Sequence, residues 1–252
     1  MQFLEIGYFQ GKGFEAYTNY LATNTHAELH SMEISCIEAG PRSEGKWPWG
    51  NFAKKHRWYE RLLHTERLHC GDANDYSFLL ETWNTKMKRT STTDENGNNI
   101  NEEDSTAPPL MVVVDDGAHI HDQMATSLFF WLPRIHPGGI LIMEDIQPIS
   151  EPNPFRTHIV PQLMKDLHWC GAGGTDQDPA GSGTAGVGKK ILDDTRCFPT
   201  LQPLIQGIHC EMHICVIVRN SVPASEPDQG TSGTPKDAFT HAQQCLFGPH
   251  ST

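Results

Sequence analysis

Short apolar runs alternate with segments of helical periodicity from residue 3 to residue 143, and an acidic side chain stands at or just after the end of each run. The clearest runs are 110–114, which stops at Asp115 and Asp116, and 140–143, which stops at Glu144 and Asp145. Continuous apolar strands that alternate with helices form largely parallel sheets covered on both faces. The sequence therefore predicts an α/β fold that gathers carboxylates at one edge of its sheet.

Seven strands are predicted in total. Five of them are 3–6, 29–34, 68–70, 110–114 and 140–143, and a C-terminal antiparallel hairpin comprises 204–209 and 211–218. One predicted helix has Phe14, Tyr17 and Leu21 at helical spacing, another begins with Asp75 as its N-cap, and a third has a buried stripe of Met124, Leu128 and Leu132. The predicted fold class is a Rossmann-like, mostly parallel seven-stranded sheet with helices on both faces.

The 252 residues suffice for one large α/β domain. We predict this domain over 1–220, with insertions at 40–64, 86–109 and 171–190, and a disordered tail at 221–252 because that tail is rich in Ser, Pro, Gly and Asp. Residues 3–6 already have the composition of a buried strand, so we expect a truncated N-terminus.

Charge and cysteine content restrict the partners and the location. The net charge of −12, without a run of Lys or Arg, argues against nucleic acid as a partner. The lack of a signal sequence and of a membrane-spanning apolar run predicts a cytoplasmic protein with no membrane contact. The seven cysteines are scattered, with no Cys-x-x-Cys pair, which favours reduced thiols. A homo-oligomer is compatible with the sequence.

The predicted strand ends are where a ligand is expected, because open parallel sheets bind ligands beyond the carboxyl ends of their strands, where strand order reverses. An acidic rim repels the pyrophosphate of a dinucleotide. It suits S-adenosylmethionine (SAM), because the sulfonium is cationic and the ribose hydroxyls and adenine amine donate hydrogen bonds. The carboxylates at the strand ends are Glu5, Glu33, Asp72, Asp115, Asp116, Glu144 and Asp145.

Several motifs resemble a known family. The glycine turn at 5–13 (Glu-Ile-Gly-Tyr-Phe-Gln-Gly-Lys-Gly), Gly-Asp at 71–72 and Pro-Gly-Gly at 137–139 together resemble class I SAM-dependent methyltransferases. Within that class, 115–119 (Asp-Asp-Gly-Ala-His) and 142–147 (Ile-Met-Glu-Asp-Ile-Gln) resemble the metal-dependent O-methyltransferases of macrolide sugars, of mycinamicin and macrocin type, and cephalosporin-hydroxylase-type and fungal hard-surface-induced-protein-like relatives. The resemblance covers residues 3–220 apart from the insertions.

The resemblance implies an O-methyltransferase that transfers the methyl group of SAM to a hydroxyl of a small, polyhydroxylated molecule, assisted by Mg²⁺. It implies that Asp116, Glu144 and Asp145 bind Mg²⁺ and that His119 is the general base. Glu33 would accept the ribose hydroxyls and Asp72 would lie near the adenine. The full set of implied SAM contacts is Glu5, Gly7, Gly11, Gly13, Glu33, Asp72 and Asp115.

Simpler roles remain open for these residues. Glycine is the default residue wherever a backbone turns tightly, Asp115 and Asp116 could be turn formers, and His119 could be a helix cap or an exposed side chain. Two other functions also remain: a SAM-binding domain without catalysis that has a regulatory or interaction role, and an NAD-dependent oxidoreductase. The glycine turn lacks Gly-x-Gly-x-x-Gly spacing, which disfavours the oxidoreductase.

Overall fold

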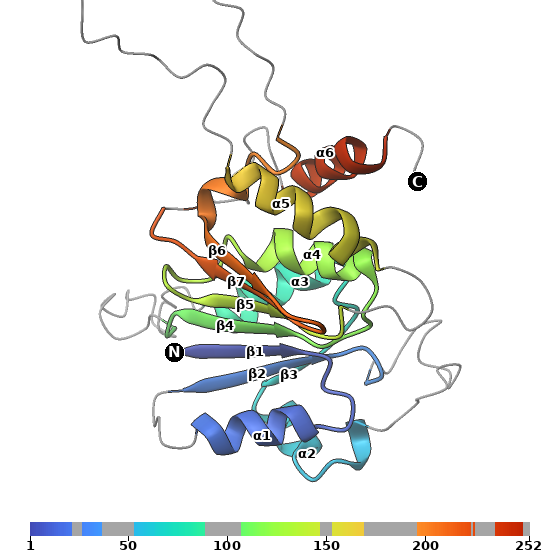
Figure 1. Ribbon diagram of the computed structural model, residues 1–252. Helices are drawn as coiled ribbons and strands as arrows, with labels where there is room; N and C mark the ends of the chain where they lie inside the picture. The colour runs from blue at the N-terminus through green and yellow to red at the C-terminus, as the bar shows by residue number, and fades with distance from the viewer. Residues whose placement is uncertain are drawn as a thin grey trace, which may run out of the picture.

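The computed structural model describes residues 1–21, 27–36, 53–88, 107–146, 153–168, 196–222, 224 and 235–248. Seven strands form one sheet in the order β3-β2-β1-β4-β5-β7-β6 (Figure 1). The first five strands are parallel to one another, whereas β7 runs antiparallel to β5 and β6. The predicted Rossmann-like class and the C-terminal antiparallel hairpin are confirmed. The strands are β1 (Gln2–Ile6), β2 (Glu28–Glu33), β3 (Leu68–Cys70), β4 (Leu110–Asp115), β5 (Ile140–Met143), β6 (Ile205–Cys210) and β7 (Cys215–Arg219).

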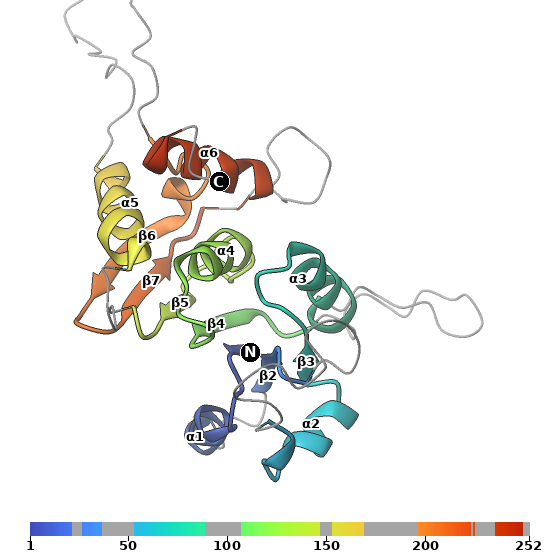
Figure 2. The same cartoon turned by 90° about the vertical axis from the view of Figure 1, so that its right-hand side faces the viewer.

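Helices cover both faces of the sheet. Helices α1 (Lys12–Leu21) and α2 (Tyr59–His64) lie on one face, and α3 (Tyr76–Thr82), α4 (His121–Trp131) and α5 (Val160–Leu167) lie on the other (Figures 1 and 2). Asp75 caps α3 as predicted, because its side chain accepts a 2.9 Å hydrogen bond from the Ser77 amide. The described residues also form four short helical segments: η1 (Ala53–Lys55), η2 (Trp83–Met87), η3 (Phe155–Ile159) and η4 (Gln202–Leu204).

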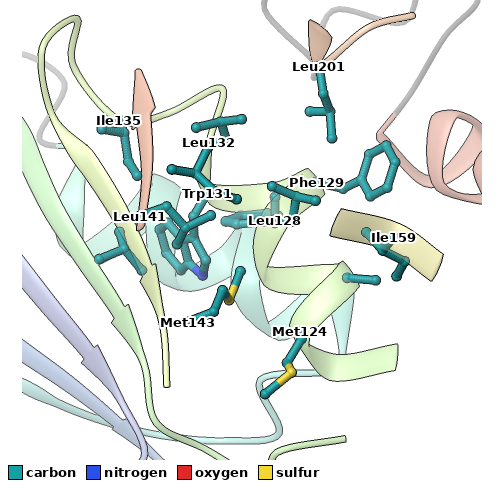
Figure 3. Close-up of a cluster of buried hydrophobic side chains, with 14 of the residues drawn as sticks. Met124, Leu128, Phe129, Trp131, Leu132, Ile135, Leu141, Met143, Ile159 and Leu201 are labelled. Atoms are coloured by element: carbon teal, nitrogen blue, oxygen red, sulfur yellow. The ribbon is translucent and has the colours of Figure 1, made fainter. Parts of the chain in front are cut away.

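The main core lies between α4 and the sheet (Figure 3). The stripe of Met124, Leu128 and Leu132 is 1%, 0% and 0% exposed, which confirms its prediction as core. Leu141 of β5 is also fully buried in this cluster. Burying each such side chain contributes roughly 1.5–3 kcal/mol, so this layer fixes α4 against the strands and thereby positions the loop that precedes it.

The C-terminal region differs from its prediction. Residues 221–252 were expected to be disordered, but α6 (Pro235–Phe247) forms within them and contacts α4. Ala242 is 1% exposed and belongs to the main core. The helix was missed because its apolar residues are few, and its stability comes from packing against the body of the domain, which local composition does not reveal.

The cysteines also differ from their prediction as reduced thiols. Three disulfides are present, Cys36–Cys70, Cys197–Cys245 and Cys210–Cys215. The first joins the ends of β2 and β3, the second ties α6 to the segment before η4, and the third closes the β6–β7 hairpin. Two of the pairs join residues 34 and 48 positions apart, so sequence spacing gave no sign of them. Cys170 lies outside the described residues.

Most of the predicted insertions lie outside the described residues, namely 40–52, 89–106 and 171–190. The remainder of the first insertion, 53–64, contains η1 and α2. Among the described residues, no helix combines the length and the apolar composition needed to cross a bilayer.

Candidate functional site

The site lies where the order of the strands reverses. The chain runs from β1 outward to β3, then returns to β4 on the other side of β1, so the switch point falls between β1 and β4. Two backbone hydrogen bonds continue the sheet past the strand ends, from the Asp116 amide to the Ile6 carbonyl and from the Glu144 amide to the Asp115 carbonyl, both 2.9 Å. The segments that follow β1, β4 and β5 therefore lie side by side.

Gly7 allows the β1 and β4 segments to approach this closely. Its φ is +102°, a left-handed conformation that glycine adopts without strain. A Cβ at this position would lie 2.1 Å from the backbone oxygen of Asp116. Glycine is thus required here because the backbone after β1 contacts the backbone after β4.

Asp116, His119 and Asp145 form a cluster in which one ligand atom from each lies within 4.8 Å of the others. His119 Nε2 is 3.9 Å from Asp116 Oδ1 and 3.8 Å from Asp145 Oδ2. Ligands of one Mg²⁺ lie roughly 3–4 Å apart, because each bond to the ion is about 2.1 Å long. The carboxylates of Asp116 and Asp145 lie within 4.8 Å of each other, so they can approach one divalent cation.

Two residues of this cluster have strained backbones. The φ angles of His119 and Asp145 are +56° and +49°, in the left-handed region that side chains other than glycine rarely adopt. The surroundings hold both in place: Asn153 Nδ2 donates to the His119 carbonyl at 3.3 Å, and the Ile146 amide, next to Asp145, donates to the His213 carbonyl at 3.1 Å. Such strain persists where neighbouring structure enforces it, and it is concentrated at functional sites.

Glu144 lies beside the cluster rather than within it. Its Oε1 accepts a hydrogen bond from Tyr17 Oη of α1 at 3.3 Å. Burial, together with the charges of Glu144 and Asp145, raises the pKa of Asp116 to about 6, against the opposing effect of His119. A cation would relieve this crowding of negative charge, and the hard oxygen donors suit Mg²⁺.

A second buried carboxyl lies on the other side of the switch point. Glu5 in β1 is 1% exposed, and burial raises its pKa to about 8, although a 3.1 Å hydrogen bond from Ser31 Oγ opposes the rise. A Cβ at Gly13 would lie 2.3 Å from Glu5 Oε1, so Gly13 makes room for this carboxyl at the start of α1. Near neutral pH Glu5 holds a proton, and a cationic ligand beside it would ionise it.

The remaining predicted cofactor residues have other contacts. Glu33 accepts hydrogen bonds from the backbone amides of Phe9 and Ser35, at 2.5 and 2.7 Å, and so holds the glycine turn against the end of β2. Asp72 Oδ1 accepts from the Asn74 amide at 2.9 Å in the turn after β3.

Two more of the predicted cofactor residues are packed against protein atoms. Asp115 is 1% exposed and its Oδ1 accepts from the Gly117 amide. A Cβ at Gly11 would lie 2.5 Å from Nδ1 of His56, a ring that is also hydrogen-bonded to the Tyr8 hydroxyl.

The structure thus brings Glu5, Asp116, His119, Glu144 and Asp145 together at the ends of β1, β4 and β5, with Glu33 and Asp72 at the ends of β2 and β3. Tyr17, Ser31 and Asn153 complete the site, although sequence reasoning did not select them. Tyr17 was assigned only to a helical stripe, and isolated Ser and Asn residues give no signal until the fold places them beside a functional group.

Comparisons with curated proteins found O-methyltransferases among the relatives of this chain. No family model matches the chain. The chain is 25% identical to demethylmacrocin O-methyltransferase of Streptomyces fradiae over 169 residues, which cover 66% of this chain and 36% of that protein. It is 30% identical to mycinamicin VI 2''-O-methyltransferase of Micromonospora griseorubida over 86 residues, which cover 34% of this chain and 17% of the relative.

Among solved structures, the MycE methyltransferase from the mycinamycin biosynthetic pathway, in complex with Mg, SAH and mycinamycin VI, aligns with a TM-score of 0.46 and 15% identity. The alignment covers 96% of this chain and 50% of that one. The sequence matches confirm the predicted resemblance to macrolide-sugar O-methyltransferases. The chain spans about a third of the length of the Streptomyces fradiae relative.

Proposed function

We propose that the chain, like the macrolide O-methyltransferases it resembles, transfers a methyl group from SAM to a hydroxyl of a small, polyhydroxylated molecule with the assistance of Mg²⁺. The observation that carries the proposal is the grouping of acidic side chains at the switch point. Glu5 lies on the α1 side of that point, and the cluster of Asp116, His119 and Asp145 lies at the ends of β4 and β5. The two groups supply separate places for a cationic cofactor and a hard divalent cation.

On the cofactor side, Glu5 and the glycine turn would receive SAM, whose sulfonium supplies an activated methyl group. Glu5 is protonated near neutral pH because it is buried. A positively charged ligand would favour the ionised form of Glu5. The ion pair between the ligand and Glu5 would be strong because the site is buried from water. Glu33 supports this binding by fixing the Phe9 amide and hence the shape of the turn.

On the metal side, the Mg²⁺ ion would be held by Asp116, Asp145 and Glu144. When bound, Mg²⁺ lowers the pKa of a hydroxyl group next to it. Mg²⁺ prefers oxygen ligands, which favours His119 as a proton acceptor rather than as a ligand. His119 Nε2 lies within 4 Å of both aspartates and would take the hydroxyl proton while the oxygen attacks the methyl carbon. The bond from that carbon to the sulfur of SAM would break at the same time, so that the sulfur leaves as a neutral thioether. The hydrogen bond from Asn153 Nδ2 to the His119 carbonyl holds the backbone that carries this ring.

Calorimetry with SAM, NAD and MgCl₂ tests the proposal against its alternatives. We expect SAM and Mg²⁺ to bind, and turnover of a polyhydroxylated acceptor to require both. SAM binding without Mg²⁺ binding would indicate a domain without this catalysis. NAD binding in place of SAM would reject the proposal outright.

Asp116→Asn is the sharpest variant, because it keeps the size of the side chain and removes one charge from the cluster. We expect Mg²⁺ binding and metal-dependent turnover to be lost while SAM affinity changes by no more than a few-fold. The melting temperature should not fall, because burial and like charges disfavour the ionised Asp116 in the folded state. Glu81→Gln, which removes an exposed carboxylate on α3, is the control and should leave Mg²⁺ binding unchanged. Loss of SAM binding in Asp116→Asn would assign this carboxylate to the cofactor instead.

A further inference from the structure

Tyr17 lies between the cofactor side and the metal side of the proposed site. It is on α1, and its ring packs on Phe3 of β1 with a centroid distance of 4.6 Å. Its Cε2 atom is 3.7 Å from the position that a Cβ on Gly13 would occupy, which places the ring beside the glycine that accommodates Glu5. The packing on Phe3 holds the ring against β1.

The Tyr17 hydroxyl reaches across the sheet to the segment after β5. It donates a hydrogen bond to Glu144 Oε1 at 3.3 Å, and 127 positions separate the two residues. Among the described residues, this is the one hydrogen bond that the Glu144 side chain makes. A glutamate has three rotatable side-chain bonds, so a donor anchored on another element restricts the directions in which its carboxylate points.

We propose that Tyr17 is a positioning residue for the metal site: its hydroxyl orients Glu144 so that the carboxylate stands ready beside Asp116 and Asp145. The inference rests on the proposed function, because it assigns Glu144 to the divalent cation. Hydrogen bonds to metal-binding carboxylates commonly raise metal affinity by fixing ligand geometry before the ion arrives. Here the donor comes from α1, the helix that follows the glycine turn, so Tyr17 physically connects the two halves of the site.

Tyr17→Phe tests this inference, because it removes the hydroxyl and retains the ring that packs on Phe3. We expect about a tenfold loss of Mg²⁺ affinity in calorimetry, the size typical of changes to groups that orient metal ligands. SAM affinity and the melting temperature should stay at wild-type values, and excess Mg²⁺ should restore turnover. Tyr20→Phe is the matched control, since Tyr20 is on the same helix and is 83% exposed.

Other outcomes reject the inference in distinguishable ways. If Tyr17→Phe binds Mg²⁺ as the wild type does, Glu144 does not depend on this hydroxyl. If Mg²⁺ binding, SAM binding and melting temperature all fall together, Tyr17 is a packing residue. If wild-type protein binds SAM but no Mg²⁺, the proposed metal site itself is wrong and the role of Tyr17 is rejected with it.

Discussion

Among the described residues other than glycine, those with positive φ are His119 and Asp145 of the candidate cluster and, outside it, Phe9 and Glu66. His119 and Asp145 both have left-handed backbones, each at an estimated cost of about 1–3 kcal/mol. Glycine adopts this conformation without strain, and Asn, Asp and His are the other residues found there most often. The conformation alone therefore fits a turn, and it is the grouping of the two side chains with Asp116 that points to a functional role.

The positive φ of His119 leads to a prediction about the free energy of unfolding of two variants. Replacing His119 by Gly should give a more stable protein than replacing it by Ala, because left-handed strain on Ala costs about 1–2 kcal/mol. The greater chain entropy of glycine offsets only about 0.4–1 kcal/mol of this, so we expect a net difference of about 0.5–1 kcal/mol in the free energy of unfolding. Chemical denaturation measures it.

His121 is the control for this comparison. It is the first residue of α4 and its φ is not positive. At that position Ala should give the more stable protein, because glycine is the poorer helix residue. The same order of stabilities at both positions would mean that the His119 backbone is not strained.

A buried histidine pair lies away from the rim, between β2 and β3. His30 Nδ1 and His69 Nε2 are 3.0 Å apart, and their rings stack with centroids 5.2 Å apart. Burial lowers the pKa of His69 to about 4, and Lys86 contributes in the same direction. The folded protein therefore favours neutral His69, whereas the unfolded chain protonates it near pH 6.5.

The stability of the protein should consequently depend on pH through His69. Between about pH 6.5 and about pH 4 the unfolded chain binds a proton that the folded protein does not, so stability is lost as the pH falls through this window. The expected loss is on the order of 3 kcal/mol. It should be largely absent in His69→Gln when denaturation at about pH 7 is compared with about pH 4.5. His136→Gln, at an exposed histidine, should behave as the wild type, and equal acid sensitivity in both variants would exclude His69 as the cause.

At the scale of elements, α6 depends on a covalent link as well as on packing. Cys245 within the helix is joined to Cys197, 48 positions earlier, and Ala242 contributes to the core. Removing a disulfide restores entropy to the unfolded chain, and the gain grows with the length of the closed loop. The helix should therefore be the part of the described structure most sensitive to loss of this bond.

Replacing both Cys197 and Cys245 by Ser should lower the free energy of unfolding by about 4 kcal/mol and reduce hydrogen-exchange protection in α6. Replacing both Cys210 and Cys215 by Ser is the matched control. Those residues are only 5 positions apart, so the expected loss is about 2 kcal/mol, with protection in α6 unchanged. Equal losses in the two double variants would contradict the loop-length argument.

The elements that sequence predicted correctly are those whose signal is local. The apolar run at 110–114 can be recognised as a strand from its own residues alone. The bounds predicted for β3 and β5 match those found in the structure. The second strand of the hairpin was predicted from 211 but begins at Cys215, because the intervening residues form the connection. Element ends depend on turns and hydrogen bonds that apolar patterns do not encode.

For the whole molecule, the sequence predicted the class of fold and the edge at which carboxylates meet. It did not predict which carboxylates contact which partners. The cluster pairs His119 with two aspartates, while Glu144 binds Tyr17, and both arrangements depend on side-chain directions set by tertiary packing. The disulfides and α6 were missed for the same reason, since each is stabilised by residues distant in sequence.

The pairing of β1 with β4 has a consequence for how the molecule assembles. Phe3 pairs with Val112, and this pair and the three that follow it have the largest separation along the chain among the strand partners of this sheet. Closing so long a loop loses chain entropy, so we expect this pairing to form slowly during folding. The acidic edge of the sheet forms only when β1 pairs with β4, so we expect a partly folded chain to lack a formed ligand site. Ligand binding should therefore require the complete sheet.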